Sequence, residues 1–188
     1  MKLDTRLETL VLTVHLAALS LALAPPIFFG AVIAPAVFKI LPTHDMAGAL
    51  QSPIISKLCG ISEASFLVLF GTAWLLTSGG AAKATRALLT RLPVLGFFAA
   101  LVIRELLIPP IDKIRAEAPG LIDNLPAGDP ARVLLDRYHR LSTGLFSLAI
   151  GAALLTLFVT ARLLSERRAA PPLPGAARVP VPKILDLS

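Results

Sequence analysis

Residues 92–111 read LPVLGFFAALVIRELLIPPI, and this stretch decides the fold because it is long and apolar enough to cross a lipid bilayer as a helix. A helix that spans the hydrocarbon core needs about 20 predominantly apolar residues. Arg104 and Glu105 lie inside the stretch, although a charge at the bilayer centre costs about 2.5–3.5 kcal/mol on insertion scales. Charges retained at such a depth are as a rule paired, hydrated or functional.

Three further stretches have the same character. Residues 10–37 contain His15 as their only titratable side chain, residues 58–76 contain the single charge of Glu63, and residues 141–161 contain no charge. The sequence therefore predicts an all-α protein in which residues 1–166 form a bundle of four transmembrane helices. An even number of spans places both termini on one side of the membrane.

The first apolar stretch could instead be a signal peptide, since Ala22-Leu23-Ala24 resembles a small-residue cleavage site. Asp4 and Glu8 interrupt the basic start that a signal peptide has, and the apolar sequence continues well past residue 24. We therefore expect an uncleaved first helix.

The composition also indicates a membrane protein. Of the 188 residues, 55% are hydrophobic and 16% are charged, whereas soluble domains have about 45–50% apolar and about 25% charged residues. The net charge of +6 comes from arginine and lysine beside the apolar stretches. This pattern favours the lipid bilayer as the partner and argues against nucleic-acid binding. The single cysteine, Cys59, excludes an internal disulfide bond and a multi-cysteine metal site.

The distribution of basic residues sets the expected orientation. Lys83, Arg86 and Arg91 follow the second span without a nearby acid, which favours both termini in the cytoplasm. The opposite loops also contain lysine and arginine, so this bias is shallow. Usage rich in alanine, leucine and arginine is typical of bacteria. The sequence thus predicts a multi-pass protein of the bacterial inner membrane.

Spans three and four are predicted to continue beyond the bilayer as a helical hairpin. Helical spacing persists past residue 111 until Pro119-Gly120, and Asp129-Pro130 has the pattern of an N-cap followed by proline at the first helical position. Alignment of the two arms would bring Arg115 near Asp136 as an exposed pair. Residues 167–188 are proline-rich and are predicted to be a disordered tail.

The intramembrane charges are the main candidates for function. Glu63 follows Lys57 by six residues and Arg104 precedes Asp112 by eight, so both lie about 10 Å below the same surface at a rise of about 1.5 Å per residue. Spans two and three run antiparallel, and an interhelical Glu63–Arg104 ion pair is therefore expected, with Glu105 spare.

Two interpretations of this pair remain open. It could only fix the register of two helices, or it could form part of a polar site that binds or passes a small solute or ion. Pro109 and Pro110 favour a site slightly, because each removes a backbone donor near the charges. Pro25 and Pro26 similarly predict a break in the first helix.

The three histidines place further polar groups. His139 at the start of span four, together with His44, lies on the side of the membrane where Glu63 and Glu105 are expected, whereas His15 lies near the other surface. Two histidines and a carboxylate could bind a divalent metal, but their spacing matches no known ligand pattern. No histidine pair lies at mid-membrane, which disfavours a haem. We therefore expect no cofactor and no metal.

Small residues form a stripe on each of the last two spans. These faces predict close helix packing and a possible contact between two copies of the chain. The sequence contains no nucleophile–base arrangement, phosphate-binding glycine loop or zinc-ligand spacing, so an enzyme is not expected. The stripes comprise Gly96, Ala99 and Ala100 on span three and Gly144, Ser147 and Gly151 on span four.

Three short motifs carry a family resemblance: APAVF at residues 34–38, IPPI at 108–111, and DRYHRLS at 136–142. In this order they resemble a bacterial membrane-protein family of unknown function that is grouped with transmembrane protein 205. The resemblance covers residues 7 to 162 and implies four membrane helices without an assigned reaction or catalytic residue. The double proline at positions 25 and 26 departs from the pattern. The matching positions are Pro35, Phe38, Pro109, Arg115, His139 and Ser142.

The sequence thus supports two main hypotheses. In the first, the chain binds or passes a small solute or ion through a polar cluster of Glu63, Arg104, Glu105 and His139. In the second, it is a structural or partner-binding membrane subunit whose charges only fix helix register. A metal- or haem-handling protein is a weaker third hypothesis.

Overall fold

The computed structural model describes residues 4–118 and 120–169, and this part of the chain consists of helices joined by short connections and contains no strand. Four helical segments, Thr5–Ile40, His44–Thr77, Lys83–Glu117 and Pro130–Arg167, are long and apolar enough to cross a membrane. The predicted all-α, four-helix bundle is therefore confirmed. Each predicted span lies inside a longer helix. The 34 residues of the second helix extend over about 51 Å, well beyond a hydrocarbon core of about 30 Å.

The first helix is continuous through its prolines. It consists of α1 (Thr5–Phe28), a π-helical turn η1 (Phe29–Ile33) and α2 (Ala34–Ile40). The predicted break at Pro25-Pro26 is wrong, because α1 continues as α-helix through both prolines to Phe28. The π-helical turn follows at Phe29–Ile33, where the N–H of Ala34 donates to the carbonyl of Phe29, five residues earlier.

The second helix, α3 (His44–Thr77), begins where Thr43 accepts a hydrogen bond from the N–H of Met46. The third comprises α4 (Lys83–Val102), a π-helical turn η2 (Ile103–Leu107) and α5 (Ile108–Glu117). After the short 3-10 helix η3 (Ile122–Asn124), Asp129 caps α6 (Pro130–Ala169) by accepting from the N–H of Ala131. The predicted helical extension of spans three and four is therefore present. Of the predicted tail, residues 170–188 lie outside the described residues.

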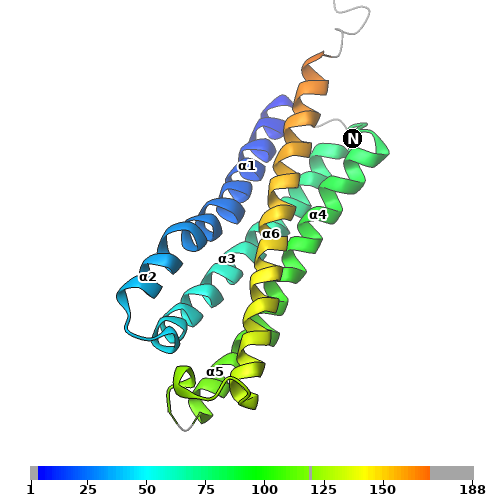
Figure 1. Cartoon of the computed structure of the whole chain (residues 1–188). Helices are drawn as coiled ribbons and strands as arrows, with labels where there is room; N and C mark the ends of the chain where they lie inside the picture. The colour runs from blue at the N-terminus through cyan, green and yellow to red at the C-terminus, as the bar shows by residue number, and fades with distance from the viewer. Residues whose placement is uncertain (1–3, 119, 170–188) are drawn as a thin grey trace, which may run out of the picture.

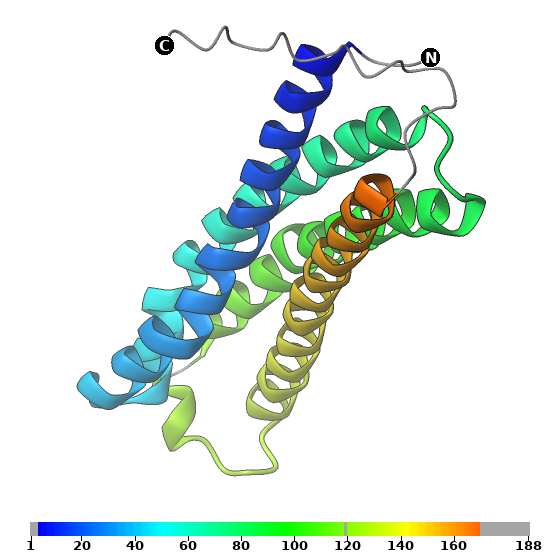
Figure 2. The same ribbon diagram turned by 90° about the horizontal axis from the view of Figure 1, so that it is seen from above.

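The helices pack as an antiparallel bundle in the order α1, α3, α4, α6, which Figures 1 and 2 show from two directions. The start of α1, the α3–α4 turn and the end of α6 lie at one end (Figure 1). An ion pair between Glu8 and Arg167 joins the first and last helices there. Toward the other end, α2 diverges from α6 (Figure 1). This divergence leaves space that the site described below occupies.

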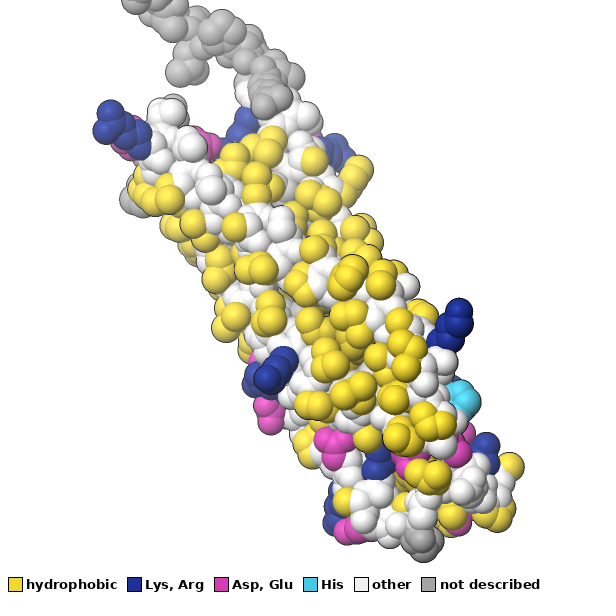
Figure 3. Space-filling view, turned by 90° about the vertical axis from the view of Figure 1, so that its left-hand side faces the viewer, with side chains coloured by type: hydrophobic (Ala, Val, Ile, Leu, Met, Phe, Trp, Pro, Cys, Tyr) yellow, Lys and Arg dark blue, Asp and Glu magenta, His cyan; other side chains and the backbone are white. Residues whose placement is uncertain are grey.

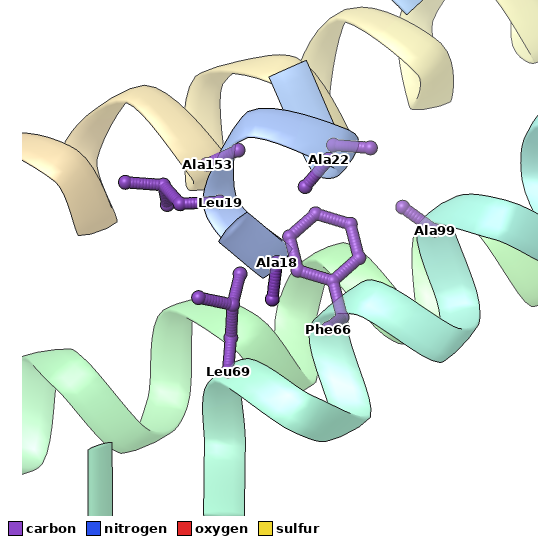
Figure 4. Close-up of a cluster of buried hydrophobic side chains, with 8 residues drawn as sticks. Ala18, Leu19, Ala22, Phe66, Leu69, Ala99 and Ala153 are labelled. Carbon is purple, nitrogen blue, oxygen red and sulfur yellow. The ribbon is translucent and has the colours of Figure 1, made fainter. Parts of the chain in front are cut away.

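Small side chains let the helices approach closely in the core. The Phe66 ring extends from α3 toward Ala18 and Ala22 of α1 (Figure 4). A Cβ atom at Gly96 of α4 would overlap this ring, so the glycine is required for the contact. The predicted small face of span three is therefore used within one chain. By contrast, Gly144 of α6 has open space beside it, so contact with a second copy there stays a prediction.

A polar group also lies inside the bundle. His15 of α1 is fully buried, with Nδ1 located 2.7 Å from Thr72 Oγ1 of α3 and Nε2 located 3.0 Å from Thr160 Oγ1 of α6. The sequence placed this histidine near the membrane surface opposite to His44 and His139. Its two partners add that it connects three helices within the bundle.

The outer surface matches a lipid-facing bundle. Hydrophobic side chains cover much of the face seen in Figure 3, and charged side chains lie toward both ends, including the end that contains α5. Large apolar side chains such as Phe98, Leu106 and Phe158 are more than half exposed. Such a surface would be costly in water and is expected against lipid.

Candidate functional site

The predicted ion pair between Glu63 of α3 and Arg104 of η2 is present. Arg104 Nη2 lies 3.0 Å from Glu63 Oε2, and Arg104 Nε lies 2.8 Å from Glu105 Oε1. Glu105 is therefore not spare, since it shares the guanidinium with Glu63. We call these three residues the ion cluster. Its two carboxylates and single guanidinium give it one formal negative charge.

The local backbone explains how Arg104 reaches Glu63. In the π-helical turn, the N–H of Ile108 donates to the carbonyl of Ile103, five residues earlier. Pro109 and Pro110 follow and have no N–H to donate. The carbonyls of Arg104 and Glu105 consequently lack an ordinary helical donor. π-helical turns inside α-helices are often found at functional sites.

The ion cluster is closed on its inner side by packing. The Glu63 side chain is 8% exposed, whereas those of Arg104 and Glu105 are 34% and 55% exposed. A Cβ at Gly60, one turn before Glu63, would lie 3.2 Å from Arg104 Nη1, so the guanidinium lies close against α3. Glu63 Oε1 is buried and accepts no hydrogen bond within the described residues. None of the three residues is among those that line the cavity described next.

A separate cavity of about 330 Å³ lies between α2, α3, α5 and α6. We call it the end cavity, because it is at the end of the bundle where α2 diverges from α6 (Figure 1). Phe38, Arg115, His139 and Ser142 all contribute to its wall. Phe38, His139 and Ser142 belong to the first and third motifs, and Arg115 lies four residues after the second. The remaining motif positions, Pro35 and Pro109, each follow a π-helical turn by two residues.

Arg115 organises the polar part of the end cavity. Its Nε lies 3.3 Å from Asp45 Oδ1, and its Nη1 lies 3.9 Å from Asp112 Oδ1. Ser52 of α3 donates to the same Asp112 oxygen at 2.7 Å. The predicted exposed pair with Asp136 is wrong. The Arg115 side chain is only 18% exposed and turns toward the first turn of α3 rather than toward α6.

Asp45 also fixes the connection between α5 and α6. Its backbone N–H donates to Asp123 Oδ2 at 3.1 Å, and its own Oδ2 accepts the N–H of Ile122 at 3.4 Å. These contacts hold η3 over the start of α3. The outer wall of the cavity is thus attached to α3 through side-chain contacts.

The structure separates the histidines from the ion cluster. His44 and His139 both line the end cavity, and the His44 ring lies 5.7 Å from that of Phe38 between centroids. The sequence-based expectation that His139 joins Glu63 and Arg104 in one cluster is therefore not met. Ile103, which precedes Arg104 in the chain, lines the cavity and so connects the two groups. Residues 4–118 and 120–169 contain no group of three His, Cys, Asp or Glu side chains placed to bind a metal.

Sequence reasoning missed Asp45, Ser52 and Asp112 as members of the site. Depth counting alone does not pair Ser52 with Asp112, because Ser52 lies eleven residues before Glu63 whereas Asp112 lies only eight residues after Arg104. The offset of three residues corresponds to about 4.5 Å along the helix axis. Asp45 carried no signal either, since its partners depend on the path of the connection after α5.

No protein-family model, curated protein or solved structure matches this chain. Function is therefore argued from the geometry of the ion cluster and the end cavity.

Proposed function

We propose that this chain is a multi-pass protein of the bacterial inner membrane that binds a small solute in the end cavity. The observation that carries the proposal is the convergence of Phe38, Arg115, His139 and Ser142 on one cavity. The volume of about 330 Å³ lies within the range of about 300–1,000 Å³ that is typical of small-molecule sites. Charged and apolar side chains share its wall, which is also typical of such sites.

The proposed orientation follows from the basic residues. Lys83, Arg86 and Arg91 would face the cytoplasm together with both termini. The end cavity would then open at the opposite, external face. A solute would reach it from outside the cell or from the outer leaflet.

In this proposal the ion cluster supports the cavity and does not form its lining. The Glu63–Arg104 pair holds η2 against α3, and the neighbouring Ile103 forms part of the cavity wall. The sequence suggested these charges as part of the polar cluster that binds or passes the solute. Their position behind the wall instead favours a role in fixing the register of η2, which then positions the wall.

The second candidate function is a structural or partner-binding membrane subunit. The closed packing of Glu63, which is 8% exposed and paired with Arg104 at 3.0 Å, favours this alternative. Under this alternative the end cavity would hold lipid or water without selectivity. We propose no enzymatic reaction for either candidate.

A ligand-binding thermal-shift experiment distinguishes the candidates. The full chain, purified in a neutral detergent, is tested with choline, acetate, glucose, octyltrimethylammonium, octanoate and octyl glucoside. We expect at least one probe to raise the unfolding midpoint, and we expect Phe38→Ala or His139→Ala to abolish that shift. Both side chains are partly exposed, so the variants are expected to fold.

Glu63→Gln provides the matched comparison. A shift lost in Glu63→Gln but kept in both cavity variants would place the solute at the ion cluster and refute a site in the end cavity. Absence of any shift with all six probes would favour the structural subunit.

A further inference from the structure

The wall of the end cavity contains more carboxylates than cations, and the cations are paired with other groups of the protein. The carboxylates are those of Asp45, Asp123 and Asp136, whereas the only two cations are Arg115 and Arg132. Arg115 is held between two carboxylates, as described above, and Arg132 Nη1 donates to the carbonyl of Leu125 at 2.7 Å. Both cations are therefore occupied by the protein itself.

Asp136 is the carboxylate left over. It forms no hydrogen bond or ion pair within residues 4–118 and 120–169, and it is exposed at the cavity rim. Deeper in the wall, the charge of Asp45 is balanced, because its buried Oδ1 lies 3.3 Å from Arg115 Nε. The surplus negative charge of the cavity is therefore that of Asp136. A cavity with surplus negative charge and low-dielectric walls attracts cations.

The lining changes from polar to apolar along the bundle axis. On α3 the cavity wall runs from Asp45 to Ile55, a rise of about 15 Å at 1.5 Å per residue. On the antiparallel helix it runs from Arg115 through Ile108 to Ile103, a rise of about 18 Å. Both helices place charge at the outer end and isoleucine toward the centre of the bundle. The cavity is thus amphipathic along the bundle axis, with a polar outer end and an apolar inner end.

An aromatic group stands at the polar end of this gradient. Phe38 of α2 is 38% exposed, lines the cavity and lies against the His44 ring. The face of a phenylalanine ring attracts an ammonium group within about 6 Å. Together with the Asp136 carboxylate, it offers the two interactions by which proteins recognise alkylated ammonium groups.

We propose that the end cavity binds an amphiphile with an ammonium head group. The head group contacts Asp136 and Phe38, and the apolar chain lies along Ile55, Ile103 and Ile108 toward the bilayer centre. This inference rests on the proposed function, because it names the ligand class of the same cavity. The ammonium belongs either to a lipid head group or to a free alkylamine.

The test uses the full chain in nanodiscs of phosphatidylglycerol, which has no ammonium group. Binding of radiolabelled octyltrimethylammonium is measured, with binding to empty nanodiscs subtracted. We expect saturable binding of octyltrimethylammonium to the unmodified chain and at least tenfold weaker binding of it to Asp136→Asn. We also expect the unmodified chain to bind the shorter butyltrimethylammonium at least tenfold more weakly. Glu117→Gln is the matched control, because it removes an exposed carboxylate at the same end that does not line the cavity. It should bind like the unmodified chain.

Several outcomes would overturn the inference. Equal weakening by Glu117→Gln would indicate a general charge effect, and unchanged binding in Asp136→Asn would remove the head-group contact. If octanoate or octyl glucoside binds and octyltrimethylammonium does not, the ammonium class is refuted, whereas the proposal of a solute-binding cavity still stands. Failure of all three probes would refute both proposals. Replacement of half the phosphatidylglycerol by phosphatidylethanolamine distinguishes a lipid head group from a free alkylamine as the natural ligand. If phosphatidylethanolamine competes with octyltrimethylammonium, the ligand is a lipid; if it does not compete, the ligand is a free amphiphile.

Discussion

The Arg115 guanidinium lies directly over Gly48, in a space that any side chain at position 48 would occupy. The glycine is one turn after Asp45, the carboxylate that pairs with Arg115. The same relationship recurs at the ion cluster, where Arg104 lies over Gly60 and pairs with Glu63. Helix α3 therefore holds each arginine between a carboxylate and a glycine three residues away. Residues at this spacing are neighbours on one helix face.

Gly48→Ala is expected to lower the free energy of unfolding. The new methyl group would overlap the guanidinium and displace Arg115 from Asp45, at a cost of about 1–3 kcal/mol. Gly71→Ala is the matched control on the same helix, because nothing lies within 4 Å of its Cβ position. It should be neutral or stabilising by up to about 1 kcal/mol. Thermal unfolding in detergent measures both, and equal stability of the two variants would contradict the packing of Arg115 on Gly48.

Arg104→Gln is expected to destabilise the chain more than any other change in the ion cluster. It would leave the Glu63 carboxylate buried without its partner, which typically costs about 3–5 kcal/mol. Glu105→Gln should cost less than about 1 kcal/mol, because that side chain is 55% exposed. Unfolding of both variants, and of Glu63→Gln combined with Arg104→Gln, tests this order. The double variant should recover most of the loss. Equal stability of the two single variants would show that Glu63 does not depend on Arg104.

The depth of charged residues could be predicted from the sequence, but the direction of long side chains could not. Counting residues from the ends of two antiparallel spans was enough to pair Glu63 with Arg104. It failed for Arg115, because the choice between Asp45 and Asp136 depends on how η3 folds over the start of α3. Helix-breaking at Pro25-Pro26 was also predicted and is wrong. Proline removes a backbone donor, but the rest of α1 continues through both prolines as α-helix.

The interior position of His15 could not be inferred from depth alone. A histidine five residues inside an apolar stretch can face lipid, a membrane surface or the bundle. Thr72 and Thr160 decide among these, and both lie in stretches that otherwise read as plain apolar spans. Polar residues on three separate helices thus form one contact that no single stretch indicates.

His15→Ala is expected to destabilise the bundle by about 2–4 kcal/mol, mainly through the cavity left by a fully buried side chain. His15→Met should recover most of this loss. The reason is that Thr72 Oγ1 and Thr160 Oγ1 can still donate to the carbonyls of Val68 and Thr156, at 2.7 and 2.8 Å, and are not left unsatisfied. Chemical unfolding of the two variants provides the measurement. A methionine variant as unstable as the alanine variant would show that the hydrogen bonds, and not the volume, stabilise this part of the core.

Ser142→Leu is expected to abolish solute binding without unfolding the chain. Ser142 lines the end cavity, and its hydroxyl donates to the carbonyl of His139 in its own helix, so the larger side chain fills the cavity without leaving a partner from another helix unpaired. Ser147→Leu is the control on α6, because that serine is also bonded within its helix but is exposed and does not line the cavity. Thermal shift is measured for both variants with the probe that most stabilises the unmodified chain. We expect no shift for Ser142→Leu and a full shift for Ser147→Leu. A full shift in both variants would place the solute outside the end cavity, whereas loss in both would point to α6 packing as the common cause.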